Sequence, residues 1–549
     1  MNKKHMPVVV VCALILVLAV IGGGAHLINR YLPTKKQMDL NEYYGQLAED
    51  EAAIVLGTEK MEERGLVSGE DFYLPISLVN QYLNQRFYWD SEGQRVLYAT
   101  PSQLTEEPAQ SEGGGSVWIK NDKVYLNVSY IKQYTDMDVY VYTEPNRIAV
   151  QYDFSDVNTV TVKKDTYLRY RGGIKSEVLA KVQKGTVLRL MEEMENWVQV
   201  ASPDGYIGYV EKKRVGEPSR IDFDRAFERE QYTYLTMDEP VNMVWHQVTT
   251  MEANAYLGEA TANMTGVNVI SPTWFSITDN DGSIMNIASS DYVAQAHGMG
   301  LKVWGLVDNF SENISTMETL SRTSSRQNLV NNLIQAALAV GLDGINIDFE
   351  YLSEDVGIHF LQFLREMSIE CHKNNLVLSV DNPVPEDFTS HYDRAEQGRV
   401  VDYVIIMGYD EHYVGSEKAG SVASLPWVEK GIQDTLEEVP PQRVINAVPF
   451  YTRLWKVVAG TLSSEAIGMD TAQNALAENQ AEIYWDKTTG QNYGSYEKDG
   501  ASYEIWLEDG ESLAAKVQLA KKYELAGVAA WKLGFENSSI WKVISDNLK

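Results

Sequence analysis

Residues 342–350 (LDGINIDFE) constrain the fold most, because polar and apolar side chains alternate along them. The polar members are Asn346, Asp348 and Glu350. Successive side chains of a β-strand point to opposite faces, so these three share one face and the apolar residues take the other. Burying carboxyl groups is costly unless they are hydrogen-bonded or take part in chemistry. The run therefore predicts a buried strand that carries a functional site.

The C-terminal part of the chain, residues 235–549, alternates strand-like runs with helix-length segments. We count eight such runs: VNMVWHQV, NVISPTWFSI, KVWGLVDN, GINIDFE, LVLSVDN, VDYVIIMGYD, VINAVPFYTRLW and GVAAWKLG. This alternation predicts an α/β fold, and eight parallel strands close a (β/α)8 TIM barrel. The stretch between the seventh and eighth runs, about 459–509, contains AEIYWD and SYEIWLED. It predicts a small α+β insertion that forms one wall of a cleft.

Two smaller modules precede the barrel. Residues 39–156 alternate short β-rich runs with turns and predict a small α+β domain. Its segments FYLPISLVNQYL and KVYLNVSYIKQY resemble the two-part pattern of copper amine oxidase N-terminal-like domains, without copper chemistry. Residues 158–216 are all-β in pattern and resemble bacterial SH3-like domains, with a Lys-Gly-Thr turn and a terminal GYIGYV run. A module of this kind binds wall peptides or acts as a spacer, and both interpretations stay open.

The first thirty residues form a separate segment. Lys3 and Lys4 precede an apolar stretch from Pro7 to Ile28, close to the ~20 residues that cross a bilayer core. A cleaved secretory signal and an uncleaved anchor both send the remaining chain outward. We favour an N-terminal transmembrane anchor over residues 1–30. It predicts a single-pass protein at a bacterial cell surface, with its bulk extracellular, or a secreted protein if the segment is cleaved.

Composition excludes several classes of function. The two cysteines, Cys12 and Cys371, cannot build a disulfide framework or a Cys-based zinc site. The formal net charge of −30 argues against a nucleic-acid partner, because phosphates are neutralised by clustered Lys and Arg. The histidines are scattered rather than spaced as ligand pairs, so we expect no metal and no cofactor.

Polar and aromatic residues recur where the predicted barrel strands end. Active residues of a TIM barrel lie at the C-terminal ends of its strands, and Glu350 closes the fourth run. The other strand-end candidates are Trp274, Asp308, Asn309, Asp381, Asn382, Tyr409, Asp410, Tyr451 and Trp531. For Asp308, Asn309, Asp381 and Asn382, sugar contacts and hydrogen bonds within the rim are equally good interpretations.

These runs together resemble family 18 glycoside hydrolases. DGINIDFE resembles their DGxDxDxE signature, MGYDEHY their Met-x-Tyr-Asp strand, and AVPFYTRLW and GVAAWKLG their late strands. Within that family the chain is most similar to the bacterial branch of spore cortex-lytic and cell-wall N-acetylglucosaminidases. One departure stands out, because Asn346 occupies the position of the middle carboxylate of the signature.

The resemblance implies a substrate-assisted retaining mechanism, which departs from the usual pair of protein carboxylates. Glu350 would be the general acid and base, and Asp348, with Asn346 beside it, would stabilise the sugar's reacting acetamido group. Tyr409 would hold the acetamido oxygen, and Trp531 would form the floor under the sugar ring. Together with the strand-end positions, this leads us to predict substrate binding by Trp531, Asp410, Tyr451, Asp343, Trp274 and Asn382.

The sequence thus predicts a glycosidase that cleaves β-1,4 linkages at N-acetylglucosamine in peptidoglycan. Chitin is the alternative substrate. A third possibility is a barrel that binds surface glycans without cutting them, although such barrels commonly lack the acid that Glu350 supplies here.

Overall fold

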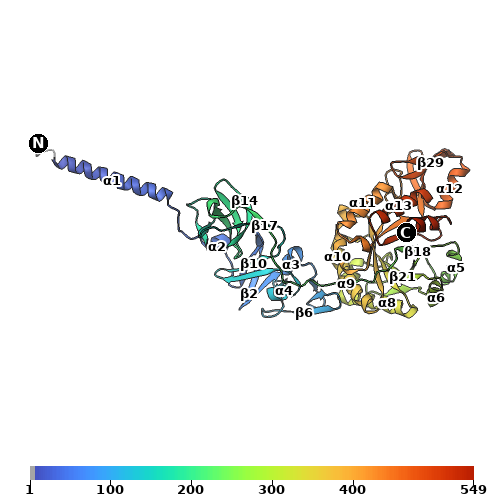
Figure 1. Cartoon of the computed structure of the whole chain (residues 1–549). Helices are drawn as coiled ribbons and strands as arrows, with labels where there is room; N and C mark the ends of the chain where they lie inside the picture. Colours follow the sequence, from blue (N-terminus) through green and yellow to red (C-terminus); the bar gives the residue numbers. More distant parts are fainter. Residues whose placement is uncertain (1–5, 549) are drawn as a thin grey trace. The chain divides into compact units, whose positions relative to one another are not determined.

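The computed structural model describes residues 6–548 and groups the chain into two compact units (Figure 1). The first unit comprises Met1–Trp89 and Glu107–Arg229. The second comprises Asp90–Glu106 and Glu230–Lys549, and it contains the predicted barrel.

Helix α1 (Met6–Tyr31) covers the apolar segment for which we predicted a membrane anchor. In this helix the structure describes the side chains of residues 9–19 and 30–31. Among the described residues, no helix combines the length and the apolar character that a bilayer crossing requires. Crossing the bilayer core takes about 20 consecutive apolar residues. The predicted transmembrane helix, and the membrane contact inferred from it, are therefore not supported.

A β-sheet in the first unit follows the order β7-β8-β3-β2-β1-β10-β9. Its strands are β1 (Glu51–Leu56), β2 (Glu59–Ser68), β3 (Asp71–Pro75), β7 (Val117–Lys120), β8 (Lys123–Asn127), β9 (Asp138–Thr143) and β10 (Asn146–Gln151). Along the chain, β4 (Tyr88–Asp90), β5 (Arg95–Ala99) and β6 (Leu104–Gln110) come before β7. Helix α3 (Ile76–Tyr82) directly follows β3, and α4 (Val128–Tyr134) directly follows β8. The two similar sequence segments thus each fold as a strand and a short helix.

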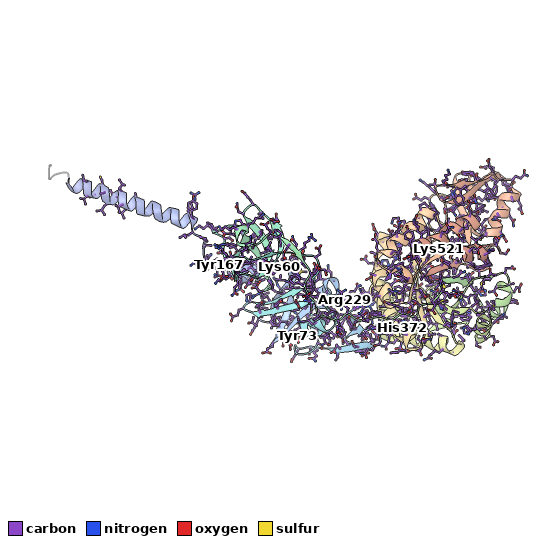
Figure 2. The ribbon with its side chains drawn as sticks, viewed as in Figure 1. Lys60, Tyr73, Tyr167, Arg229, His372 and Lys521 are labelled. Carbon is purple, nitrogen blue, oxygen red and sulfur yellow. The ribbon has the colours of Figure 1, made fainter. Side chains whose placement is uncertain are left out.

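The core of this sheet contains Tyr73, which is labelled in Figure 2. Its ring is fully buried and packs edge-on against Trp118, with ring centroids 5.3 Å apart. Edge-to-face pairs of this kind stabilise a core beyond the area they bury.

The all-β module of the first unit has the strand order β13-β12-β16-β15-β14-β11-β17. The strands are β11 (Val157–Thr161), β12 (Thr166–Arg169), β13 (Val178–Val182), β14 (Val187–Glu193), β15 (Trp197–Ala201), β16 (Ile207–Glu211) and β17 (Ser219–Ile221). Helix α2 (Leu40–Tyr44) completes its core. The Tyr43 hydroxyl is 2.8 Å from both the O and the N of Ile207, and Tyr44 donates to Gly205 O. Helix α2 therefore covers the module around Gly205 and Ile207.

Eight parallel strands within the described residues close a barrel in the second unit, because β18 pairs with both β31 and β19. They are β18 (Val241–His246), β19 (Val269–Ile277), β21 (Lys302–Asp308), β22 (Gly344–Asp348), β23 (Val377–Pro383), β24 (Tyr403–Met407), β25 (Val444–Pro449) and β31 (Gly527–Trp531). Each falls in one of the eight predicted runs, so the TIM-barrel prediction is confirmed. Strand β20 (Ile284–Asn286) adds an antiparallel edge to β19.

Helices cover the outside of this barrel (Figure 1). They are α5 (Leu257–Ala260), α6 (Ser290–Gly298), α7 (Thr316–Ser321), α8 (Thr323–Val340), α9 (Gly357–Lys373), α10 (Arg394–Val400), α11 (Leu425–Leu436), α13 (Gly510–Lys522) and α14 (Ile540–Leu548). A buried ion pair joins two of them: Arg326 of α8 lies 2.9 Å from Glu366 of α9.

Strand alternation divides the barrel residues into two groups. The inward-facing apolar side chains form a cluster that includes Met243, Trp245, Trp304, Tyr403 and Ile405. The side chains of opposite parity, such as those of Ile345 and Ile347 on β22, pack outward in the core under the helices. Polar side chains at inward-facing strand positions consequently meet inside the barrel.

The predicted insertion is an antiparallel sheet in the order β27-β26-β30-β29-β28. It comprises β26 (Tyr451–Val458), β27 (Thr461–Gly468), α12 (Met469–Glu478), β28 (Ile483–Asp486), β29 (Gln491–Lys498) and β30 (Ala501–Trp506). The insertion begins at Tyr451, earlier than the predicted boundary near residue 459. One continuous apolar run had hidden the break, since barrel strand β25 ends at Pro449 and the insertion strand starts two residues later.

We expect Gly344→Ala to destabilise the barrel. A Cβ at Gly344 would lie 2.7 Å from Trp304 Cδ1 and 2.7 Å from the backbone oxygen of Val377. Overpacking of this kind costs about 1–3 kcal/mol, so the midpoint of thermal unfolding of the barrel should fall. Gly298→Ala in the last turn of α6 is the matched control, because its Cβ would meet nothing within 4 Å. Equal midpoints for the two variants would contradict the packing argument.

Candidate active site

Strand β22 points Asn346 and Asp348 into the barrel, and Glu350 follows at its mouth. Asn346 is fully buried, Asp348 is nearly so, and Glu350 is half-buried. The row thus runs from the barrel interior to solvent, and the deepest position holds the neutral amide.

Asn346 makes hydrogen bonds to residues of three other strands. Its Oδ1 accepts from Trp245 Nε1 at 2.8 Å and from Ser271 Oγ at 3.3 Å. Its Nδ2 donates to Ser379 Oγ at 3.0 Å and to Asp381 Oδ1 at 2.9 Å. An amide has both acceptor and donor groups, so it satisfies all four contacts. A carboxylate in its place could not donate to Asp381.

The pKa of Asp348 is shifted strongly by its surroundings. Burial raises its pKa well above the usual value, and the charges of Asp381, Glu350 and Asp308 act in the same direction. Its Oδ1 is buried and has no hydrogen-bond partner among the described residues. A buried acceptor left unpaired is costly, and in a native site it calls for an explanation such as a bound ligand.

Asp381 shares this environment. Burial raises its pKa well above the usual value, the Asn346 hydrogen bond lowers it, and the charge of Glu350 raises it. Neighbouring carboxyls titrate as a set rather than separately. The raised pKa of both groups means that Asp348 and Asp381 take up protons more readily than exposed carboxyls do.

Glu350 also has a raised pKa. Burial is the largest cause, followed by the charges of Asp410 and Asp308. The raised pKa of Asp348 fits this set of causes, since a protonated neighbour exerts no charge repulsion.

The backbone at the acid is held by Asn309. Its Nδ2 donates to Glu350 O and its Oδ1 accepts from Glu350 N, both at 3.0 Å. Of the two interpretations left open for Asn309, the structure therefore favours a hydrogen bond within the rim. Asp308 accepts from Ser276 Oγ at 2.8 Å and from the amide of Phe310.

A tyrosine pair lies beside the carboxyl cluster. Tyr409 follows β24, and its ring meets that of Tyr451 edge-on at 6.1 Å. Burial raises the pKa of Tyr409 well above its usual value, and the charges of Tyr451, Asp348, Asp381 and Glu350 raise it further. Tyr409 therefore stays a neutral hydrogen-bond donor beside the carboxyl cluster.

Tyr451 donates to Asp410 Oδ1 at 2.6 Å. Asp410 is exposed overall, but its carboxyl group is partly desolvated. Desolvation raises the pKa of Asp410, and this outweighs the lowering by the Tyr451 hydrogen bond and by the charge of Arg453. This pair joins the barrel loop after β24 to the first strand of the insertion.

Trp531 ends β31 and packs beside Trp245, with ring centroids 5.9 Å apart. Trp245 in turn is bonded to Asn346. The structure thus brings together Asn346, Asp348, Glu350, Tyr409, Asp410, Tyr451 and Trp531 through inward parity, direct bonds or mutual electrostatic effects.

Comparisons with known proteins identify the barrel. Residues 271–536 match the family model Glycosyl hydrolases family 18, and residues 164–216 match the model Bacterial SH3 domain. Over these residues the barrel is similar to family 18 of the glycosyl hydrolases. Its enzyme class is that of a glycosidase, as expected from the sequence. These matches do not show the resemblance of residues 39–156 to copper amine oxidase N-terminal-like domains.

Two curated relatives come from Bacillus subtilis (strain 168). The uncharacterized glycosylase YvbX is 27% identical over 314 residues, which cover 55% of this chain and 90% of YvbX. The cortical fragment-lytic enzyme is 28% identical over 246 residues, which cover 43% of this chain and 57% of that enzyme. The match thus spans little more than half of the cortical enzyme.

Among solved structures, the chitinase of Chromobacterium violaceum ATCC 12472 superposes with a TM-score of 0.50 and 24% identity. The match covers 56% of this chain and 99% of the chitinase. At this identity the likeness shows the fold.

Three predicted substrate contacts lie away from the carboxyl cluster of the barrel. Trp274 and Asn382 have the outward strand parity: Trp274 donates to Asn254, and Asn382 exchanges hydrogen bonds with Gln397. Asp343 precedes β22, at the opposite end from Glu350, and binds Lys302 and His297. The nearness of these residues to a strand end in the sequence did not reveal whether their side chains face the interior or the exterior of the barrel.

The sequence reasoning missed other residues of the site. Trp245, Ser271 and Ser379 hydrogen-bond Asn346, and Arg453 acts on Asp410. Counting strand parity from Asn346 across neighbouring runs is the signal that could have found the first three. Among the described residues, no group of three or more His, Cys, Asp or Glu side chains is arranged to hold a metal ion.

We expect Asp381→Asn to raise the unfolding midpoint at about pH 7 and to lose this advantage towards about pH 4. The pKa of Asp381 is higher in the folded state than in the unfolded chain. Its favourable contribution is therefore present at low pH, below the unfolded value of about 3.9, and is lost as pH rises through the folded value.

Asp343→Asn is the matched control, with the opposite sign. Burial raises the pKa of Asp343, but hydrogen bonds from Lys302, Val303 N and His297 lower it overall. Neutralising it should lower the midpoint at about pH 7. Differential scanning calorimetry across pH would test both, and a stabilised Asp343→Asn with a destabilised Asp381→Asn would refute the electrostatic account.

Proposed function

We propose that the chain hydrolyses β-1,4 glycosidic bonds at N-acetylglucosamine in peptidoglycan by substrate-assisted retention. The observation that carries the proposal is the unpartnered Oδ1 of Asp348 beneath Glu350. An acetamido N–H of a bound sugar would supply the donor that this buried oxygen lacks.

In the first step the Glu350 carboxyl gives its proton to the glycosidic oxygen, and the bond from that oxygen to the sugar C1 breaks. The acetamido carbonyl oxygen forms a bond to C1 and closes an oxazolinium ring. Asp348 accepts from the acetamido N–H, and Tyr409 donates to the acetamido oxygen. The Glu350 carboxylate then takes a proton from water as it attacks C1, which reopens the ring.

The electrostatics support these roles. A general acid must keep its proton near neutral pH, and burial with the charges of Asp410 and Asp308 raises the pKa of Glu350. Since the sugar supplies the nucleophile, the mechanism needs one protein acid at the scissile bond. The indole of Trp531 provides an apolar surface for the sugar ring.

Peptidoglycan is favoured over chitin by two observations. The chain contains a bacterial SH3 domain match, and one relative is named a cortical fragment-lytic enzyme. Action on the wall places the protein outside the cell. Chitin stays the alternative substrate because a solved chitinase shares the fold.

We expect Glu350→Gln to reduce hydrolysis by roughly 10²–10⁴-fold, the contribution of a general acid. Its unfolding midpoint should not fall, because the raised pKa of Glu350 means that its charge does not stabilise the fold. Mass spectrometry of digests of purified wall and of chitin oligosaccharides would measure both rate and products. A variant with the full rate would remove the assignment of the acid, and binding without cleavage by the wild type would leave a glycan-binding barrel.

A thiazoline analogue of N-acetylglucosamine should inhibit competitively, because it mimics the oxazolinium ring. Its affinity should exceed that of the product sugar by about 10²-fold or more, as is typical of analogues of reactive species. Asp348→Asn should weaken this inhibition, whereas Asp343→Asn should leave it unchanged. Indifference of the wild type to the analogue would exclude the acetamido route while leaving hydrolysis itself intact.

A further inference from the structure

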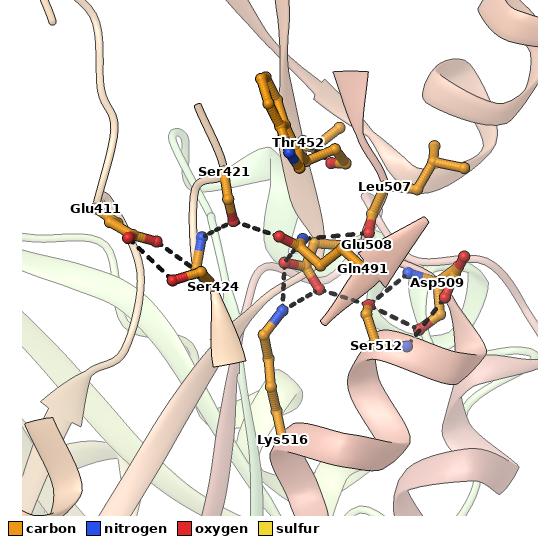
Figure 3. Close-up of polar contacts among 12 residues, drawn as sticks. Glu411, Ser421, Ser424, Thr452, Gln491, Leu507, Glu508, Asp509, Ser512 and Lys516 are labelled. Atoms are coloured by element: carbon orange, nitrogen blue, oxygen red, sulfur yellow. Dashed lines mark hydrogen bonds and ion pairs between the residues drawn. The ribbon is translucent and has the colours of Figure 1, made fainter. Parts of the chain in front are cut away.

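A buried ion pair lies where the insertion rejoins the barrel (Figure 3). Lys516 Nζ of α13 is 2.6 Å from Glu508 Oε1 and 2.7 Å from Oε2, and both side chains are fully buried. Ser512 Oγ donates to Glu508 Oε2 at 2.9 Å. Glu508 follows β30, so the pair ties the end of the insertion to a barrel helix.

Gln491 extends this contact to a second part of the chain. Its Nε2 donates to Glu508 Oε1 at 2.8 Å, and its Oε1 accepts from Ser421 Oγ (Figure 3). Ser421 lies in the loop between β24 and α11, and its Oγ also accepts from Ala423 N at 2.9 Å. One buried amide therefore connects the ion pair to that loop.

Asp410 lies near the start of this loop, three residues after β24 ends. Glu411 ties its two ends together, since its carboxylate accepts from Ser424 N at 2.7 Å and from Ser424 Oγ at 2.9 Å. Asp410 itself has a left-handed backbone with φ of 64°. A residue in this conformation depends on its surroundings to hold it there.

The insertion carries the other half of the contact. Tyr451 opens β26 and donates to Asp410, while Thr452 Oγ1 donates to the backbone oxygen of Trp506, two residues before Glu508. Burial is the main cause of the raised pKa of Tyr451, and the charge of Glu508 contributes. Both partners of the Asp410–Tyr451 hydrogen bond are thus connected to the same ion pair. Asp410 is connected through its loop and Gln491, and Tyr451 is connected through the contact between Thr452 and Trp506.

We propose that the Lys516–Glu508 pair positions the Asp410–Tyr451 contact beside the catalytic acid. Lys516, Glu508 and Gln491 act as positioning residues: they hold the loop of Asp410 against the strand of Tyr451 and thereby set the surroundings of Glu350. The inference rests on the proposed hydrolytic function. It adds that the insertion works as one body with the loop after β24 rather than as an independent wall.

The barrel contains a second pair that separates this role from simple stabilisation. Arg326 and Glu366 are also buried, lie 2.9 Å apart, and are joined by a glutamine, since Gln362 Nε2 donates to Glu366 Oε1 at 2.9 Å. This pair links the outer helices α8 and α9, which cover the outside of the barrel. Arg326→Met is therefore the control for Lys516→Met.

The experiment measures kcat and KM of the full chain on whichever of chitotetraose and purified wall the wild type cleaves. Rates are normalised to folded protein by circular dichroism. Lys516→Met should lower kcat by about tenfold or more with a smaller change in KM, because the acid is mispositioned in the transition state. Arg326→Met should lower the unfolding midpoint but change kcat by less than about twofold.

Two further variants keep the test sharp if Lys516→Met folds poorly. The double variant Lys516→Met with Glu508→Gln leaves no buried charge. Its amide oxygen can still accept from Gln491, and its amide nitrogen can donate to the Ser512 hydroxyl, so it should recover most of kcat. Ser421→Ala leaves the ion pair intact and removes the link to the loop. It should lower kcat by about threefold without changing the midpoint.

The outcomes separate the two proposals. A wild type that cleaves neither substrate refutes the proposed function. An active wild type whose Lys516→Met and Ser421→Ala variants keep kcat, or whose Arg326→Met loses as much as Lys516→Met, overturns the positioning role alone. Failure of the double variant to recover kcat also overturns it.

Discussion

The amide of Asn346 is the contact on which the buried part of the site depends. It joins β22 to β18, β19 and β23 through four hydrogen bonds in the interior of the barrel. Two carboxyls, Asp348 and Asp381, lie in the same dehydrated space. A neutral side chain that both donates and accepts can satisfy its neighbours there without adding a third like charge. The departure from the family signature is thus accommodated by the hydrogen-bond geometry.

The electrostatic character of the site changes with depth. Desolvation is the largest cause of the raised pKa of Asp348, Asp381 and Glu350, and the charge of Asp410 on the rim raises the pKa of Glu350 at the mouth further. Asp410 is in turn bonded to Tyr451 of the insertion. The acid therefore depends on a contact whose two partners come from different parts of the chain, and the buried Lys516–Glu508 pair stands behind both. This explains why an inserted subdomain can influence chemistry that takes place at the end of a barrel strand.

Much of the fold could be predicted from sequence. The eight apolar runs are long, strongly β-forming and separated by helix-length segments, so local pattern and global fold agree. The alternation in residues 342–350 identified the inward row correctly, because apolar and polar positions differ there at every step. Trp274 and Asn382 were placed in the site by their nearness to strand ends, yet both face outward. In strands buried on both faces, polarity does not report parity, and a bulge in β19 shifts the register further.

The sequence by itself determined the barrel, the order of its strands, the inward row of β22 and the presence of an insertion, because these follow from short-range periodicity. Only the tertiary structure decided which polar groups meet: Trp245 with Asn346, Tyr451 with Asp410, and Lys516 with Glu508. These pairs are separated by 101, 41 and 8 positions, and none forms a local pattern. Their energies come from hydrogen bonding in surroundings with little water, inside the barrel for the first pair and near the junction of the insertion with the barrel for the other two. Such environments exist only after distant segments have packed together.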